Sequence, residues 1–202
     1  MFYEPRNGHG LPHDPFKAIV APRPIGWISS VSRDGALNLA PYSYFNAIGS
    51  NPHMVMFASE GEKDSLTFIR ETGEFVANLV GRDLAEQMNM TGIDAPRGVS
   101  EFEHAGLTPV ASQLVAPPRV GEALAALECK VTEIHHPKGL DGKPAGSIVV
   151  FGEVVGVHIK DEALTDGLFD IVRAGTVSRL GYREYAAISA TFEMIRPRWK
   201  DG

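Results

Sequence analysis

The sequence of 202 residues predicts a mainly β fold, in which antiparallel strands form a closed or partly closed barrel. Six or seven short apolar segments alternate with turn-forming residues, whereas only two or three segments have a helical pattern. Glycine occurs 21 times and proline 14 times, which suits a chain with many turns. Hairpins outnumber strand–helix–strand units, and an antiparallel barrel is the simplest way to bury such strands and protect their edges.

A hairpin opens the predicted barrel. Residues 1–24 contain five prolines and are expected to be an irregular lead-in. The apolar segment 25–31 ends at Ser32-Arg33-Asp34-Gly35, and Asp-Gly between two apolar segments is a strong hairpin pattern. The partner strand is predicted over 36–45, with an edge position or a bulge at Pro41, because proline cannot donate to a sheet ladder.

The next predicted elements are a buried strand, a helix and another strand. Residues 54–58 and 75–80 have the apolar pattern of strands. Between them, 63–72 is predicted to be a helix with Asp64 or Ser65 as its N-cap and Gly73 at its end. A second helix is predicted to start at Asp83-Leu84-Ala85-Glu86, which has the form of a capping box, and to run to about Met90.

The second half of the chain is predicted to be loops and long strands. Residues 93–120 are expected to be a loop with a turn of helix near 100–104. Segment 127–134 alternates, with Leu127, Cys129 and Val131 on one face, and 138–146 is expected to be a hairpin loop. Segment 147–159 is predicted to bend at Gly152 and Gly156. A short helix is expected near Asp170, and a last strand over 184–195 with apolar inner positions at 188, 190, 192 and 194.

Composition excludes several classes of protein. Nineteen Lys and Arg against 25 Asp and Glu give a net charge of −6, which argues against nucleic acid as the main partner. The longest apolar segments have five residues, too few for a membrane-spanning helix. No export signal is visible and Cys129 stands alone, so we expect a cytoplasmic protein. No linker or charge run marks a boundary, so residues 1–202 are expected to form a single domain.

Common catalytic and metal-binding motifs are absent. The sequence has no GxGxxG after a strand and no GxxxxGK[ST], GxSxG, HExxH or CxxC. Its seven histidines never fall at HxH spacing, and the one HxxxH pair, His9 and His13, lies in the proline-rich lead-in. We therefore expect no metal site and no catalytic side-chain nucleophile.

Two polar segments are candidates for ligand binding. Residues 38–45 mix hydrogen-bonding side chains with aromatic rings around Pro41, and backbone groups without ladder partners there could bind a flat polar heterocycle. Residues 59–65 join a strand to a helix, and a helix start with Lys63 and nearby serines suits a phosphate. The alternatives are aromatic residues packed in the core and a plain capped helix with Lys63 in solvent. Glu60 and Glu62 count against an anion unless both point outward.

An ordered set of segments resembles the flavin reductase-like family, the FMN-binding split-barrel group that includes nitrilotriacetate monooxygenase component B and flavoredoxin. The set begins with Ala21-Pro22-Arg23-Pro24-Ile25-Gly26-Trp27 within 14–31 and continues through Asn38-Leu39-Ala40-Pro41-Tyr42-Ser43 and Lys63-Asp64-Ser65-Leu66. Later pieces include Gly73-Glu74-Phe75-Val76, Glu101-Phe102-Glu103, Pro117-Pro118-Arg119-Val120 and Arg179-Leu180-Gly181. The resemblance covers roughly residues 12–185 in order.

The resemblance implies a six-stranded antiparallel split β-barrel, a homodimer, and FMN held near the subunit interface. It implies that the isoalloxazine ring is bordered by Asn38, Leu39, Ala40, Pro41, Tyr42 and Ser43. It places Ser59, Lys63, Asp64 and Ser65 around the phosphate, with Asp64 capping the helix, and Trp27, Ile28 and Ser29 along the ring or ribityl chain. Arg179 is implied on the flavin or nicotinamide side.

The resemblance also singles out Tyr182 and His158. Family members commonly have a second glycine where this chain has Tyr182, so a side chain there is expected to narrow the nicotinamide entrance. His158 matches a position on the late barrel strand, where the alternative is a histidine with its hydrogen bonds satisfied inside the barrel.

The function implied is an NAD(P)H-dependent flavin reductase that supplies reduced FMN to a partner oxygenase. The alternative is a flavoredoxin-like electron-transfer flavoprotein with tightly bound FMN, and a third interpretation is a cofactor-free β-barrel interaction module. Pyridoxamine-phosphate oxidase-like proteins share the split barrel, but the Arg-Pro-Ile-Gly-Trp and Asn-Leu-Ala-Pro segments favour the flavin reductase branch.

Overall fold

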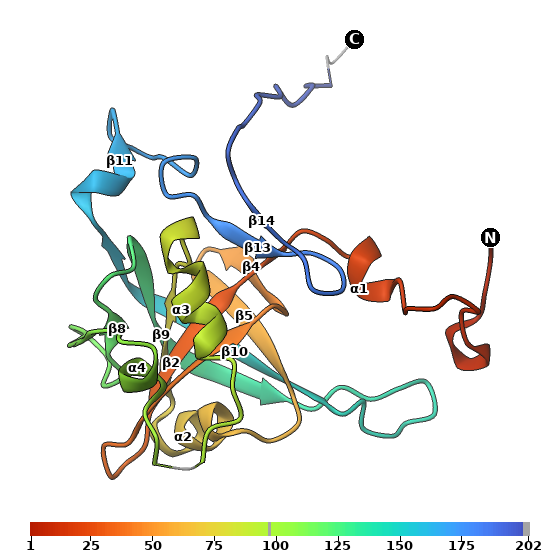
Figure 1. Cartoon of the computed structure of the whole chain (residues 1–202), viewed down its shortest axis with the longest axis horizontal. Coiled ribbons are helices and arrows are strands. Elements are labelled where there is room, and N and C mark those ends of the chain that lie inside the picture. Colours follow the sequence, from red (N-terminus) through yellow and green to blue (C-terminus); the bar gives the residue numbers. More distant parts are fainter. Residues whose placement is uncertain (97, 200–202) are drawn as a thin grey trace.

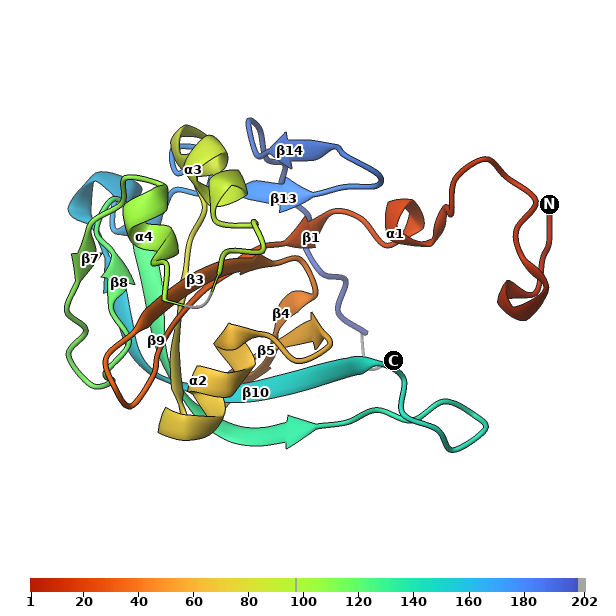
Figure 2. The same cartoon turned by 60° about the horizontal axis from the view of Figure 1, so that its bottom comes forward.

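A computed structural model describes residues 1–96 and 98–199 and confirms the mainly β fold. At its centre is a seven-stranded antiparallel sheet in the order β3-β2-β6-β9-β10-β5-β4, which curls into a half-barrel (Figures 1 and 2). Its strands are β2 (Gly26–Val31), β3 (Leu37–Tyr42), β4 (Phe45–Ser50), β5 (His53–Glu60), β6 (Glu74–Asn78), β9 (Ala125–His135) and β10 (Ser147–Ile159).

Short strands and helices surround this sheet. The helices are α1 (Phe16–Ile19), α2 (Asp64–Thr72), α3 (Ala85–Met90) and α4 (Glu101–His104), with single 3₁₀ turns at Pro5–Asn7, Arg82–Leu84 and Asp161–Ala163. The short strands are β1 (Arg23–Pro24), β13 (Val177–Arg179) and β14 (Tyr185–Ala187) in one sheet, β7 (Pro109–Val110) with β8 (Arg119–Val120), and β11 (Leu164–Thr165) with β12 (Leu168–Phe169). The first residues extend away from the sheet as an arm (Figures 1 and 2).

The edge position predicted at Pro41 is confirmed, because β3 ends the sheet. Pro41 lies opposite Trp27 of β2, and two residues earlier the Leu39 N–H points away from β2 to a carboxylate of Glu101, 3.1 Å away. Backbone direction repeats every two residues along a strand, so an N–H at Pro41 would also point outward. The missing donor therefore leaves the β2–β3 ladder intact.

The chain turns at Ser43-Tyr44 and enters β4, which pairs with β5 and forms the other edge of the sheet. The sequence analysis placed Phe45 at the end of the preceding strand and did not predict β4. This extra strand is why the sheet has seven strands rather than six. The barrel is split between β3 and β4, its two edge strands.

Strand β2 is buried on both faces and separates two apolar cores. Ile28 points into the barrel interior with Phe57, Phe75 and Cys129. Trp27 points the other way, into a core covered by helices α3 and α4. Because both faces are covered, Gly26–Val31 is an almost continuous buried strand.

The bends predicted in β10 are confirmed. Its register against β9 shifts between Phe151 and Gly152 and again between Val154 and Gly156. A Cβ at Gly152 would lie 2.6 Å from ring atoms of Phe75, so the bend also admits that ring against the strand.

Three local predictions are wrong. The last strand covers only Tyr185–Ala187, because β13 offers three partner residues, and Phe192 and Met194 are 85% and 84% exposed. No helix forms near Asp170, whose carboxylate instead accepts from Arg173 N and Thr165 Oγ1 in a turn. The N-cap of α2 is Lys63, and Asp64 is the first residue of the helix, where a carboxylate still favours the helix dipole.

Residues 97 and 200–202, which belong to the predicted loop 93–120 and the predicted domain 1–202, lie outside the described residues. Within the part of the chain that the structure describes, no helix is long and apolar enough to cross a bilayer.

Candidate functional site

A cavity of ≈ 280 Å³ lies where the edge strand β3 meets the start of α2. Loop 91–95 and helix α4 complete its wall. Half of its lining consists of residues that the sequence analysis singled out: Asn38, Ala40, Pro41, Tyr42, Lys63, Asp64 and Ser65. Two segments with 20 residues between them in the chain, 38–42 and 63–65, thus form one site.

A second hollow of ≈ 270 Å³ shares Pro41 and Gly92 with this cavity. It contains two more predicted residues, Ser43 and Arg179. The Arg179 guanidinium lies 4.5 Å from the ring centroid of Tyr185, donates to the Tyr185 hydroxyl, and donates to the Tyr182 carbonyl over 2.5 Å. These contacts fix Arg179 on the wall of the second hollow.

The floor of the cavity is a chain of buried hydrogen bonds. One Glu101 oxygen accepts from Asn38 Nδ2 at 3.2 Å and the other accepts from Leu39 N at 3.1 Å. Asn38 Oδ1 in turn accepts from the Ser65 hydroxyl at 2.5 Å. The sequence analysis did not name Glu101 as a site residue, although the Glu101-Phe102-Glu103 segment belongs to the resemblance. A signal was therefore present, but nothing local in the sequence shows that α4 packs against β3.

Burial raises the pKa of Glu101, and the nearby Asp64 carboxylate acts in the same direction. The donors on Leu39 and Asn38 oppose this rise without cancelling it. The carboxyl group at the cavity floor therefore holds a proton more readily than an ordinary glutamate.

Tyr42 lines the cavity and carries a buried hydroxyl. Its hydroxyl is buried and has no hydrogen-bond partner among the described residues. Burial raises its pKa, which keeps the proton on the oxygen, and the nearby Ser65 and Ser59 hydroxyls oppose the rise. A buried hydroxyl without a partner costs free energy unless a water or ligand accepts from it.

Charges around the cavity are mixed. Glu60 lies outside it and pairs with Lys17 at 3.3 Å, while Glu62 lines it and pairs with Arg70 at 3.1 Å. Lys63 is the one cation among the described lining residues. Four carboxyl side chains line the same cavity: Glu62, Asp64, Asp94 and Glu101. An anionic ligand would thus depend on the protonation and pairing of these groups.

The other five predicted residues lie outside both hollows. Trp27, Ile28, Ser29, Leu39 and Ser59 are 0% exposed and line neither hollow. Trp27 Nε1 donates to Thr91 Oγ1 at 2.8 Å and so holds the start of loop 91–95. The Ser59 hydroxyl donates to the Gly61 carbonyl at 2.9 Å. Their contact with a flavin stays a prediction.

Tyr182 lies beside the second hollow without lining it. Its ring is tilted against His13 with centroids 5.7 Å apart, and its backbone has a φ of 54°. Its effect on nicotinamide access also stays a prediction.

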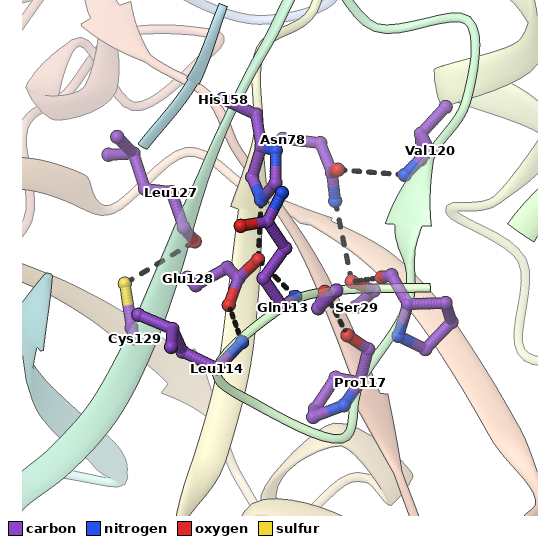
Figure 3. Close-up of polar contacts among 12 residues, drawn as sticks. Ser29, Asn78, Gln113, Leu114, Pro117, Val120, Leu127, Glu128, Cys129 and His158 are labelled. Atoms are coloured by element: carbon purple, nitrogen blue, oxygen red, sulfur yellow. Dashed lines mark hydrogen bonds and ion pairs between the residues drawn. The ribbon is translucent and has the colours of Figure 1, made fainter. Parts of the chain in front are cut away.

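A second buried polar cluster lies on β9 and β10 (Figure 3). One Glu128 oxygen contacts His158 Nε2 and accepts from Gln113 N at 2.8 Å, and the other accepts from Leu114 N at 2.6 Å. Burial raises the pKa of Glu128, but these donors outweigh it and the net pKa is lowered. His158 is thus engaged in the barrel wall.

Among the described residues outside the cavity, we find neither a reactive thiol nor a metal site. Burial raises the pKa of Cys129 to about 12, so its thiol stays protonated at neutral pH and is a poor nucleophile. Within residues 1–96 and 98–199, no three His, Cys, Asp or Glu side chains gather as metal ligands would.

Comparisons with known proteins find similar sequences and folds over most of the chain. The family model described as "Flavin reductase like domain" matches residues 20–177. Nitrilotriacetate monooxygenase component B from Bacillus cereus is 30% identical with a TM-score of 0.86, covering 96% of this chain and 98% of that one. The 2-nitrobenzoate 2-nitroreductase of Pseudomonas fluorescens is 30% identical (TM-score 0.80, covering 93% and 91%). Flavoredoxin of Desulfovibrio vulgaris (Miyazaki F) is 25% identical (TM-score 0.76, covering 87% and 91%).

Proposed function

Because the chain belongs to the flavin reductase like domain family, we propose that it binds FMN in the cavity between β3 and α2 and oxidises NAD(P)H. On this proposal residues 1–202 act as one cytoplasmic domain, two copies form a homodimer, and the reduced flavin serves a partner oxygenase. The similarity to a monooxygenase component B supports the last part.

The observation that carries the proposal is the convergence of predicted ring-side and phosphate-side residues on one cavity. Asn38, Ala40, Pro41 and Tyr42 come from β3, and Lys63, Asp64 and Ser65 come from the start of α2. Tyr42 also lines this cavity, and its buried hydroxyl lies near the hydroxyls of Ser65 and Ser59. The residues present therefore fit a ligand with a flat polar ring and an anionic tail.

At the phosphate end, Lys63 and the start of α2 supply positive potential. The first N–H groups of a helix have no acceptor within the helix, and the helix dipole favours an anion there. The Lys63 ammonium is the flexible cation that would follow the phosphate. These groups would contribute affinity rather than chemistry.

At the ring end, the edge strand offers its backbone. The outward-facing positions of β3 have no ladder partner, so the carbonyl group of Pro41, which lines the cavity, is available as an acceptor. FMN, when bound, supplies the hydride-accepting ring, and no side-chain nucleophile is required. The chain's part is to orient the ring and to leave the second hollow, with Arg179 on its wall, for the nicotinamide.

The binding part of the proposal is tested by titrating the purified protein with FMN. Lys63→Ala should weaken FMN binding by about tenfold or more, because a hydrogen bond to a charged group is lost. Lys143→Ala is the matched control, since its side chain is 81% exposed in the β9–β10 hairpin loop. Equal affinities in parent and Lys63→Ala would refute the phosphate assignment.

The activity is tested by mixing the FMN-loaded protein anaerobically with NADH and with NADPH while the flavin absorbance is followed. A reductase should bleach the flavin with at least one nicotinamide and should turn over added FMN. A second candidate, an electron carrier with tightly bound FMN, is favoured by the likeness to flavoredoxin. Retained flavin that neither nicotinamide reduces would favour the carrier over the reductase.

A further inference from the structure

The hydrogen bonds on the cavity floor have a fixed direction. An ionised carboxylate can only accept, so Glu101 requires Asn38 to present its NH₂ group. Asn38 must then present its carbonyl oxygen to Ser65, and Ser65 must donate its only proton to it. With Glu101 ionised, the Ser65 hydroxyl has no proton left for the cavity.

This donor–acceptor direction of the hydrogen bonds is unfavourable for binding an anion beside Ser65. Ser65 lines the cavity at the start of α2, where the proposed phosphate needs donors. A serine oxygen that can only accept presents lone pairs to that phosphate. The same serine becomes a donor only if the whole hydrogen-bond chain reverses.

We propose that Glu101 is a positioning residue whose protonation reverses this chain and turns Ser65 into a donor for the FMN phosphate. This inference rests on the proposed function and adds to it that binding takes up one proton. The proton comes from solvent and stays on a Glu101 oxygen. No covalent bond other than this O–H is formed.

The reversed chain satisfies every group. Protonated Glu101 donates to Asn38 Oδ1 while its other oxygen still accepts from Leu39 N. The Asn38 amide turns over, and its NH₂ group donates to Ser65 Oγ. The Ser65 proton then points into the cavity. Only the amide and the hydroxyl rotate, so the backbone of β3 and α2 need not move.

The surroundings of Glu101 favour the uptake of a proton. It is 6% exposed and its pKa lies above the usual range of a glutamate. The titratable and charged groups that share its cavity are Tyr42 on β3, Lys63 and Asp64 at the start of α2, Glu62 just before it, and Asp94 in loop 91–95. An arriving phosphate adds negative charge to this set and raises the affinity of Glu101 for a proton further.

Glu101→Gln tests the inference, because a glutamine keeps the shape and fixes the reversed direction. Its NH₂ group donates to Asn38 Oδ1, and its oxygen accepts from Leu39 N. At pH 8 this variant should bind FMN about tenfold or more tightly than the parent. The variant should take up one proton fewer than the parent when it binds FMN, so its FMN affinity should change less steeply with pH. Glu103→Gln, on the exposed side of the same helix, is the charge-matched control.

A double-mutant cycle separates reversal of the chain from simple loss of a negative charge. If Ser65 transmits the effect, the gain from Glu101→Gln should disappear in a Ser65→Ala background. Riboflavin, which lacks the phosphate, should bind parent and Glu101→Gln equally. A gain that persists without Ser65, or that riboflavin shares, would overturn the inference.

Calorimetric titration in two buffers of different ionisation enthalpy measures the protons taken up on FMN binding. The parent should take up more protons than Glu101→Gln near the pKa of Glu101, with the FMN phosphate contributing equally to both. Equal proton uptake with normal FMN affinity would overturn the inference and leave the proposed function intact. Failure of the parent to bind FMN at any pH would overturn both.

Discussion

Glu101 and Glu128 are both buried, at 6% and 0% exposed, yet their surroundings shift their pKa values in opposite directions. Glu128 contacts His158 and two backbone N–H groups, and these contacts lower its pKa more than burial raises it. Glu101 has only uncharged donors and lies near Asp64, so burial raises its pKa more than the donors lower it. Glu101 lines the cavity, whereas Gln113 and Leu114 close over Glu128.

The difference in surroundings indicates that Glu128 has a structural role, whereas Glu101 can change its protonation state at a ligand cavity. Glu128 ties the loop before β8 to the barrel wall, and every partner it has stabilises its charge (Figure 3). Glu101 is held in place by its donors but remains easy to protonate. If Glu101 served stability alone, a cationic partner would stabilise its ionised form and make the fold more stable.

The largest expected effect is on stability. Glu128→Ala leaves two backbone donors and His158 without their acceptor and should lower the free energy of unfolding by about 3–5 kcal/mol. Glu101→Ala leaves two uncharged donors beside a cavity that water can enter and should cost only about 1–3 kcal/mol. Urea unfolding at pH 7, with the slope checked for constancy, measures both. A larger loss for Glu101→Ala would reverse the comparison.

The pH dependence of stability should separate the two residues by sign. Because the pKa of Glu128 is lowered, its stabilising contribution is present above the ordinary carboxyl pKa of 4.5 and is lost as the pH falls. Because the pKa of Glu101 is raised, its contribution is present below 4.5 and is lost as the pH rises through its folded pKa. Between pH 4 and 8, Glu128→Gln should become less stable relative to the parent and Glu101→Gln more stable. Urea midpoints at several pH values test this, and parallel trends would contradict it.

The smallest effect concerns backbone strain near the cavity. Tyr182 has a φ of 54°, a conformation that suits glycine far better than a large side chain. Tyr182→Gly should therefore raise stability by up to about 1 kcal/mol, even though the His13 contact is lost. Asp166→Gly, with a φ of 52° in the β11–β12 turn, is the control and should gain less, because aspartate tolerates this region better. A loss of stability in Tyr182→Gly would show that the ring contact outweighs the strain.

Elements with strong local patterns were predictable from the sequence. The Asp-Gly hairpin, helix α2 ending at Gly73, and the bends of β10 at Gly152 and Gly156 all rest on residues with a specific backbone preference. Elements that depend on a distant partner were not. Residues 188–194 alternate like a strand, but β13 is too short to pair with them, and β4 has no apolar alternation of its own because most of it is exposed.

The residues of the candidate site also divide into those that could be predicted from local sequence and those that depend on distant partners. Residues Asn38–Tyr42 and Lys63–Ser65 were predicted because their own chemistry and the family resemblance mark them, and the structure gathers all of them except the buried Leu39 at one cavity. The proposed use of Trp27, Ser29 and Ser59 could not be judged from sequence, because burial depends on what packs over a strand. Glu101 was missed for the same reason.

The sequence alone determined that this chain forms hairpins, that one strand contains a proline which only an edge tolerates, and that a cation stands at the start of a helix. These properties depend on covalent structure and near neighbours. Tertiary structure alone decided that Glu101 faces Asn38 and Ser65 while Glu128 faces His158. The two glutamates are chemically identical, so only the long-range packing around each one, which sets burial and donors, makes their pKa values differ.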